Sequence, residues 1–138
     1  MLIHQLLQFD ARWFAAAPMF ISEGGHELSF AAGLARTEAI SRLLLAQGLM
    51  PGDRVAILGE NSMEHILTLF GAAMAGMVAV PLNFRLAPRE LEYILVDAEA
   101  RMLVVTDRSS LETGVELTRR VAGLRVFSGA PGVDGVPH

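Results

Sequence analysis

Short apolar runs alternate with longer, mostly helical segments through the middle of this chain, and this alternation constrains its fold more than any other feature. The runs cover Arg54–Gly59, Met77–Leu82, Arg101–Thr106 and a shorter fourth segment, Leu124–Phe127. Runs of this length without polar alternation are typical of strands that are covered on both faces of a parallel sheet. The pattern therefore predicts an α/β fold, a parallel-sheet βαβ subdomain with flanking helices.

Capping residues predict where two of the helices begin and end. Ser29 is a candidate N-cap for a helix that ends before Gly48. After the first apolar run, Asn61 is a candidate N-cap, and Glu64 stands three residues on, at the acidic position of a capping box. We expect this second helix to reach about Ala75.

Three further segments carry helical signals. The first runs from Ile3 to about Ala17 and is stopped by the proline that follows. Another begins at Pro88, because proline suits the first position of a helix. The third is Ser109–Val121, in which Ser109 and Glu112 are spaced as a capping box.

A hairpin and a tail complete the predicted organisation. Met19–Ser22 and Glu27–Phe30 are short and β-like, and they flank two glycines that accept the positive φ of a tight turn. Residues 1–127 are expected to form one α/β subdomain. Residues 128–138 are rich in Gly and Pro and are expected to form a linker or tail.

The segment from Ile66 to Phe84 contains no charged residue and approaches the length of a membrane-spanning helix. Gly71 and Gly76 interrupt it, however, and Pro81 closes it. The valines before the proline favour a strand. We therefore interpret the segment as a buried helix followed by a buried strand, with no transmembrane span.

Composition excludes several kinds of chemistry. All 11 basic residues are Arg and no Cys is present, so lysine amines, thiol nucleophiles and thiolate metal sites are excluded within these residues. The net charge of -4 argues against nucleic-acid binding. No glycine-rich phosphate loop is present, and the histidines lack a second ligand at convincing spacing. No catalytic residue and no metal site are therefore predicted here. The first residues lack the basic segment of a secretory signal, so we expect a cytoplasmic protein.

Arg85 is the one candidate binding residue. It follows an apolar run and precedes the helix that begins near Pro88. Ligands of open parallel sheets collect beyond the carboxyl ends of the strands, and an arginine there can bind phosphate oxygens with two donors. The alternative, a solvated loop arginine, is favoured by position alone. Asn83 is interpreted as a turn residue whose side chain bonds the backbone.

Ordered segments along most of the chain resemble the N-terminal region of adenylate-forming acyl-CoA synthetases, the AMP-dependent synthetase and ligase family. They are Leu28–Phe30, Pro51–Leu58, Glu60–Ser62, Ala75–Asn83, Glu90–Leu95 and Met102–Val105. The resemblance implies a fragment of a larger enzyme that forms an acyl-adenylate from a carboxylate and ATP, and then an acyl-CoA thioester. It implies ATP, Mg²⁺ and coenzyme A as cofactors, and it places Arg85 near the nucleotide phosphates of CoA.

The motifs by which this family binds ATP and its essential lysines come later in such enzymes, so the resemblance implies that this chain alone is inactive and binds none of these cofactors. The substrate is expected to be a fatty or related carboxylic acid. Two alternatives stay open: an adenylating domain that loads a carrier protein, and a non-enzymatic α/β binding or oligomerisation module. Hydrophobic residues make up 52% of the chain, and surface that meets a second subdomain would be exposed here. We therefore expect a homo-oligomer.

Overall fold

The computed structural model describes residues 2–129. Its elements in chain order are α1 (Ile3–Trp13), β1 (Pro18–Ile21), β2 (Glu27–Ser29), α2 (Phe30–Ala46), β3 (Arg54–Leu58), α3 (Met63–Met74), β4 (Val78–Pro81), α4 (Pro88–Asp97), β5 (Ala100–Val105), α5 (Leu111–Arg120) and β6 (Arg125–Ser128). Helices and strands alternate from α2 onward, as the apolar runs predict.

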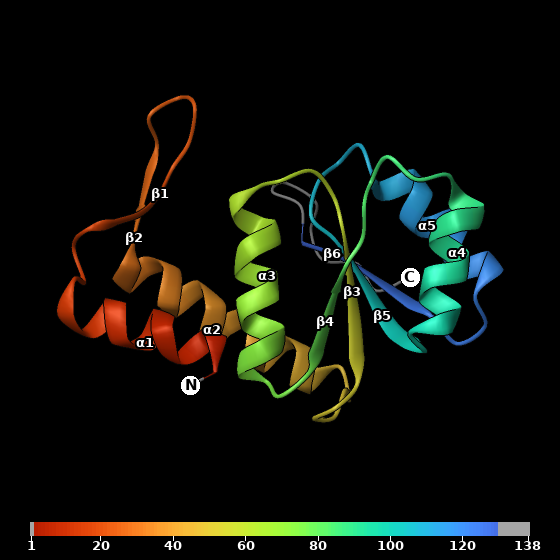
Figure 1. Ribbon diagram of the computed structural model, residues 1–138, viewed down its shortest axis with the longest axis horizontal. Helices are drawn as coiled ribbons and strands as arrows, with labels where there is room; N and C mark the ends of the chain where they lie inside the picture. Colours follow the sequence, from red (N-terminus) through yellow and green to blue (C-terminus); the bar gives the residue numbers. More distant parts are fainter. Residues whose placement is uncertain (1, 130–138) are drawn as a thin grey trace.

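Four parallel strands form the central sheet, in the order β4-β3-β5-β6. Figure 1 shows α2 and α3 on one face of the sheet and α4 and α5 on the other. The predicted α/β class and parallel sheet are therefore confirmed. Since β3 and β5 lie in the middle, they are covered on both faces, and every residue of β3 after Arg54 is buried.

Alternate residues of the strands supply two separate hydrophobic cores. Leu103 and Val105 of β5 face α4 and α5, whereas Met102 and Val104 face α2 and α3. The first core is completed by residues that include Leu58, Leu91, Leu95, Leu117 and Val126. The second is completed by residues that include Leu44, Val55, Ala72 and Met77. This two-sided burial explains why the strands are apolar without alternation.

The uncharged segment forms α3 and β4, as predicted, and no helix among the described residues is long and apolar enough to span a membrane. One detail of the prediction is wrong. β4 is an edge strand, and Val78 is 50% exposed, because only β3 pairs with it and its outer side has no neighbouring strand among residues 2–129.

Ser29 caps α2 as predicted, since its Oγ accepts the N–H of Ala32 at 3.2 Å. The predicted cap of α3 is wrong by one residue. Ser62, not Asn61, is the N-cap, and its Oγ accepts the N–H of His65 at 3.1 Å. This removes the capping box, because Glu64 is then only the second helical residue.

The predicted capping box of α5 is also wrong. α5 begins at Leu111, and the hydroxyl of Ser109 donates to Asp107 Oδ1 at 2.7 Å instead of accepting from the helix. α1 ends at Trp13, four residues before its predicted end, because the chain turns there to enter β1.

β1 and β2 form the predicted antiparallel hairpin, with Gly25 at a φ of 76° in its turn. At the other end, Ser128 is the last residue of β6. Of the predicted tail, residues 130–138 lie outside the described residues.

Candidate functional site

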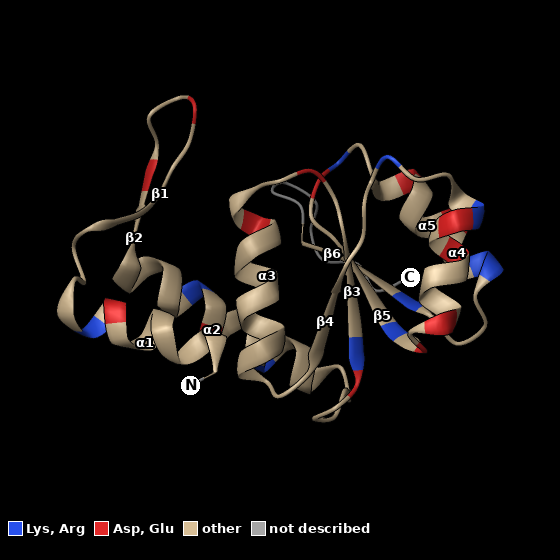
Figure 2. Cartoon of the chain, viewed as in Figure 1, with Lys and Arg blue, Asp and Glu red and all other residues tan. Residues whose placement is uncertain are grey.

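The loops that follow the parallel strands meet along one edge of the sheet. They comprise residues 59–62 after β3, 82–87 after β4 and 106–110 after β5. Figure 2 shows both acidic and basic residues along these loops. This edge is where an open parallel sheet binds its ligands.

β3 and β5 form the topological switch point of the sheet. The two strands are neighbours, but the helices that follow them, α3 and α5, cover opposite faces. The two loops therefore lead away to opposite faces of the sheet. In doubly wound sheets a bound nucleotide or other anion commonly occupies a crevice between two such loops.

In this chain the side chain of Asp107 bridges the two loops. Its Oδ2 accepts the backbone N–H of Glu60 at 2.6 Å, and its Oδ1 accepts the backbone N–H of Ser110 at 2.8 Å. With the Ser109 hydroxyl, these donors surround the carboxylate as they would surround a bound anion. The residues at the switch point therefore do not fit the phosphates of ATP, which would bring further negative charge against Asp107.

The same contacts set the ionisation of Asp107. Partial burial alone would raise the pKa of its carboxyl group. The hydrogen bonds from Ser109, Glu60 and Ser110 outweigh burial, and they hold the pKa below the ordinary aspartate value. The charged carboxylate is thus favoured in the folded chain.

We expect this carboxylate to make folding pH-dependent. Since the folded pKa is lowered, the stabilisation is fully present above the ordinary aspartate pKa of about 4, and it is lost as the pH falls through the lowered folded value. Asp107→Asn should therefore lower the free energy of unfolding by about 1–3 kcal/mol at neutral pH, and by progressively less in acid. Urea unfolding between pH 7 and pH 2.5 measures this difference.

Asp97→Asn is the matched control, because Asp97 makes no side-chain hydrogen bond or ion pair within residues 2–129. A gap between Asp107→Asn and the unmodified chain that stays constant down to pH 2.5 would contradict the assignment.

Gly59 makes the close approach of the two loops possible. Its φ is +155°, and an added Cβ would meet Thr106 Oγ1 and Asp107 Oδ2. Only a residue without a side chain leaves room for the Asp107 carboxylate beside the end of β3.

Arg85 lies at the same edge, in the loop that leaves β4. Its guanidinium lies over the ring of Phe84, 5.6 Å from the ring centre. Asn83 Oδ1 accepts the backbone N–H of Arg85 at 3.0 Å, which confirms the predicted turn role of Asn83. Within residues 2–129, no carboxylate lies at ion-pair distance from Arg85, so its charge is available to a ligand.

His65 is buried, with only 7% of its surface exposed. Burial lowers its pKa, and the nearby charge of Asp107 opposes that effect. Its Nδ1 has no hydrogen-bond partner among the described residues. The same part of the chain contains no cluster of three or more potential metal ligands.

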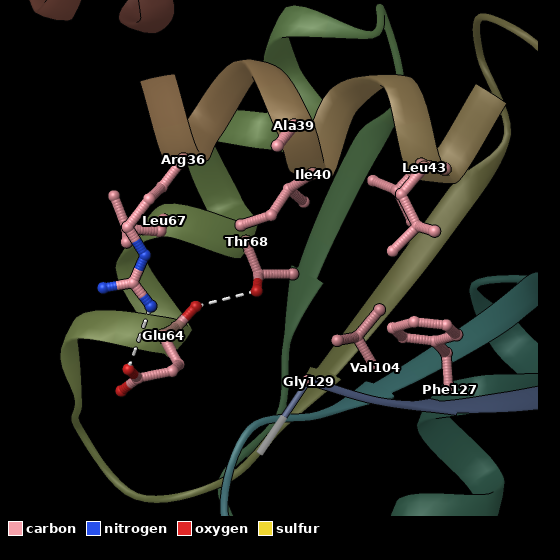
Figure 3. Close-up of a pocket in the computed structure, with 11 residues that line it drawn as sticks. Arg36, Ala39, Ile40, Leu43, Glu64, Leu67, Thr68, Val104, Phe127 and Gly129 are labelled. Atoms are coloured by element: carbon pink, nitrogen blue, oxygen red, sulfur yellow. Dashed lines mark hydrogen bonds and ion pairs between the residues drawn. The ribbon is translucent and has the colours of Figure 1, made fainter. Parts of the chain in front are cut away.

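A separate groove of about 250 Å³ lies between α2, α3 and the sheet. Figure 3 shows its apolar lining, which includes Ile40, Leu43 and Phe127. At one end, Arg36 pairs with Glu64 at 3.4 Å, and both charges are already engaged with each other. The groove therefore offers apolar contact but no free reactive group.

The fold and its edge define a doubly wound α/β module. A model of the AMP-binding enzyme family matches residues 7–130, and the chain belongs to this family. It is 43% identical over 86 residues to a feruloyl-CoA synthase of Amycolatopsis sp, an alignment that covers 62% of this chain and 18% of the relative. It is 38% identical over 103 residues to the fatty acid–[acyl-carrier-protein] ligase ScoC of Streptomyces coeruleorubidus. That alignment covers 75% of this chain and 20% of the relative.

Solved structures agree with these matches. A crystal structure assigned as a long-chain-fatty-acid CoA ligase of Rhodopseudomonas palustris superposes with a TM-score of 0.86 at 25% identity. The alignment covers 97% of this chain and 34% of that one. The chain thus spans about a fifth of the length of the curated relatives and a third of this structure.

Proposed function

We propose that this chain is the N-terminal α/β subdomain of an AMP-forming carboxylate–CoA ligase. The observation that carries the proposal is the match of residues 7–130 to the AMP-binding enzyme family. The contacts of Asp107 at the switch point of the sheet engage the donors that phosphates would need there. In the whole enzyme, a carboxylate oxygen attacks the α-phosphorus of ATP, and pyrophosphate leaves. The thiol of CoA then attacks the acyl carbonyl carbon, and AMP leaves.

Mg²⁺ would accompany ATP, and both would be held by parts of the enzyme that these residues do not supply. The chain has no lysine to bind phosphates, and Asp107 takes up the hydrogen-bond donors at the switch point. The 138-residue chain by itself is therefore expected to catalyse no ATP–pyrophosphate exchange. We place the whole enzyme in the cytoplasm, and we take fatty or related acids as its substrates.

The acceptor separates two versions of the proposal. One relative is a CoA synthase and another is an acyl-carrier-protein ligase, so a carrier protein is the alternative acceptor. The whole protein should be incubated with ATP, Mg²⁺ and a panel of fatty and aromatic acids. AMP release that depends on CoA supports the ligase, and transfer only to a carrier's phosphopantetheine supports the alternative. No adenylate with any acid would favour a non-enzymatic module.

Arg85 is proposed to bind the nucleotide phosphates of CoA. The support is its position in a loop at the carboxyl edge, its exposure and its lack of an acidic partner among the described residues. Its stacking on Phe84 limits the directions that the guanidinium can take. A planar guanidinium offers paired donors to phosphate oxygens.

Arg85→Ala in the whole enzyme should raise the KM for CoA about tenfold, as expected for the loss of one charge-assisted contact, and should leave the KM for ATP unchanged. Pantetheine lacks the nucleotide, so its KM should not change. Arg89→Ala, which removes an exposed arginine of α4, is the matched control. An unchanged KM for CoA in Arg85→Ala would refute the role.

A further inference from the structure

α1 has two apolar faces on opposite sides of one helix. Leu7 and Ala11 are buried on the inner face, where α1 contacts α2 and α3. Leu6, Phe9 and Trp13 lie on the outer face, and Leu2 continues the row at the N-cap; their exposed fractions are 45%, 56%, 63% and 62%. A helix that is apolar on both sides is normally covered on both. We call Leu2, Leu6, Phe9 and Trp13 the outer stripe.

The spacing of the outer stripe is that of a helix–helix seam. Its members are separated by four, three and four residues, the interval at which apolar side chains follow one edge of a helix that packs along another helix. Phe9 and Trp13 already contact each other, with ring centres 6.2 Å apart. Gln5, Arg12 and Asp10 flank the stripe with polar groups, as polar residues flank the apolar seam of a coiled coil.

We propose that the outer stripe binds the outer stripe of a second copy of this chain, with the two α1 helices antiparallel. A two-fold axis between Leu7 and Gln8 would place Leu2 against Trp13 of the partner subunit, and Leu6 against Phe9 of the partner subunit. Each aromatic ring would thus meet an aliphatic side chain. A surface that complements itself in this way is what a two-fold dimer requires.

Charge favours a second copy over a lipid surface. α1 contains one acidic and one basic residue, Asp10 and Arg12, so the helix has no excess positive charge to attract anionic lipids. In the antiparallel register, Arg12 lies beside Gln5 of the partner subunit and Asp10 beside Ile3 of the partner subunit. No like charges meet across the seam.

The position of α1 also suits such a contact. Figure 1 shows α1 at the end of the molecule away from α4 and α5. A partner there leaves the carboxyl edge of the sheet and Arg85 free. The dimer is therefore independent of the proposed ligase function, and either can fail without the other.

The first experiment measures the mass of the 138-residue chain by sedimentation at increasing concentration. The expected result is a dimer at about 100 µM that dissociates on dilution, because the seam is short. Phe9→Glu should reduce the mass twofold at the same concentration. Tyr93→Glu is the matched control, since Tyr93 is an exposed aromatic residue of α4 outside the stripe, 72% exposed against 56% for Phe9, and the dimer should persist.

A monomeric unmodified chain would overturn the proposal, and so would a Phe9→Glu variant that stays dimeric. Binding of the unmodified chain, but not of Phe9→Glu, to phosphatidylglycerol vesicles would also overturn it, because the stripe would then face lipid. Sedimentation of the whole protein is the last arm. A monomer there would also overturn the proposal, because the rest of the polypeptide would then cover α1 in place of a second copy.

Disulfide trapping tests the orientation and does not depend on how Phe9→Glu folds. The chain has no cysteine of its own, so any disulfide reports on introduced residues. Leu2→Cys combined with Trp13→Cys should give covalent dimers on mild oxidation. Leu2→Cys alone should not, because the two copies of residue 2 would lie about 16 Å apart along the helices. Rapid trapping by Leu2→Cys alone would show a parallel pair and overturn the antiparallel proposal.

Discussion

Leu103→Ala is expected to lower the free energy of unfolding by about 3–5 kcal/mol, a large part of the about 5–15 kcal/mol that stabilises an ordinary domain. Leu103 is fully buried in β5, a central strand, and belongs to the core beneath α4 and α5 with Leu91 and Leu117. Alanine at this position leaves a cavity that the rigid sheet cannot close. Urea unfolding followed by circular dichroism measures the loss.

Leu45→Ala serves as the control for this substitution. Leu45 is the same residue type on α2, but 45% of it is exposed, so its truncation should change the unfolding free energy by no more than about 1 kcal/mol. Equal effects of the two substitutions would mean that β5 does not lie at the centre of the sheet.

Gly59→Ala is expected to cost about 3 kcal/mol or more, because two penalties combine. The φ of +155° is one that side chains with a Cβ rarely adopt, and the added carbon would collide with Thr106 Oγ1 and Asp107 Oδ2. The loop must move, and the hydrogen bond from Glu60 to Asp107 must break or lengthen. Hydrogen exchange at the Glu60 amide should accordingly become faster.

Gly48→Ala separates the two penalties. Gly48 has a φ of +78°, but no atom lies within 4 Å of the position that a Cβ would take. Its substitution should therefore carry only the backbone cost of about 1–2 kcal/mol. Equal losses at Gly48 and Gly59 would show that the contact with Asp107 contributes nothing.

The strands and helices could be predicted because their signals are local. Burial on both faces makes β3 and β5 apolar throughout, and this pattern is visible in any window of the sequence. Asn83 could be assigned to its turn for the same reason, since its partner is two residues away. The sequence does not decide which residue caps α3, because Asn61 and Ser62 are adjacent and both residue types cap helices.

The features that could not be predicted depend on residues far apart in the chain. Asp107 accepts from Glu60, 47 residues away, and nothing around Asp107 in the sequence indicates that partner. The edge position of β4 depends on which strands pair. α1 presents a different difficulty, because its inner and outer rows are both apolar, and the sequence alone does not indicate which one is buried.

The closed switch point has a consequence for the order in which the protein is assembled. Glu60, Ser109 and Ser110 donate to Asp107 at the junction of the loops after β3 and β5, and the negative charge at its centre is the chain's own carboxylate. These contacts therefore form without a nucleotide, and the concentration of a ligand does not change how strongly they stabilise the junction of the two loops. The sheet and its two hydrophobic cores are complete within residues 2–129, so the folded sheet can serve as a preformed base on which later segments of a longer polypeptide fold.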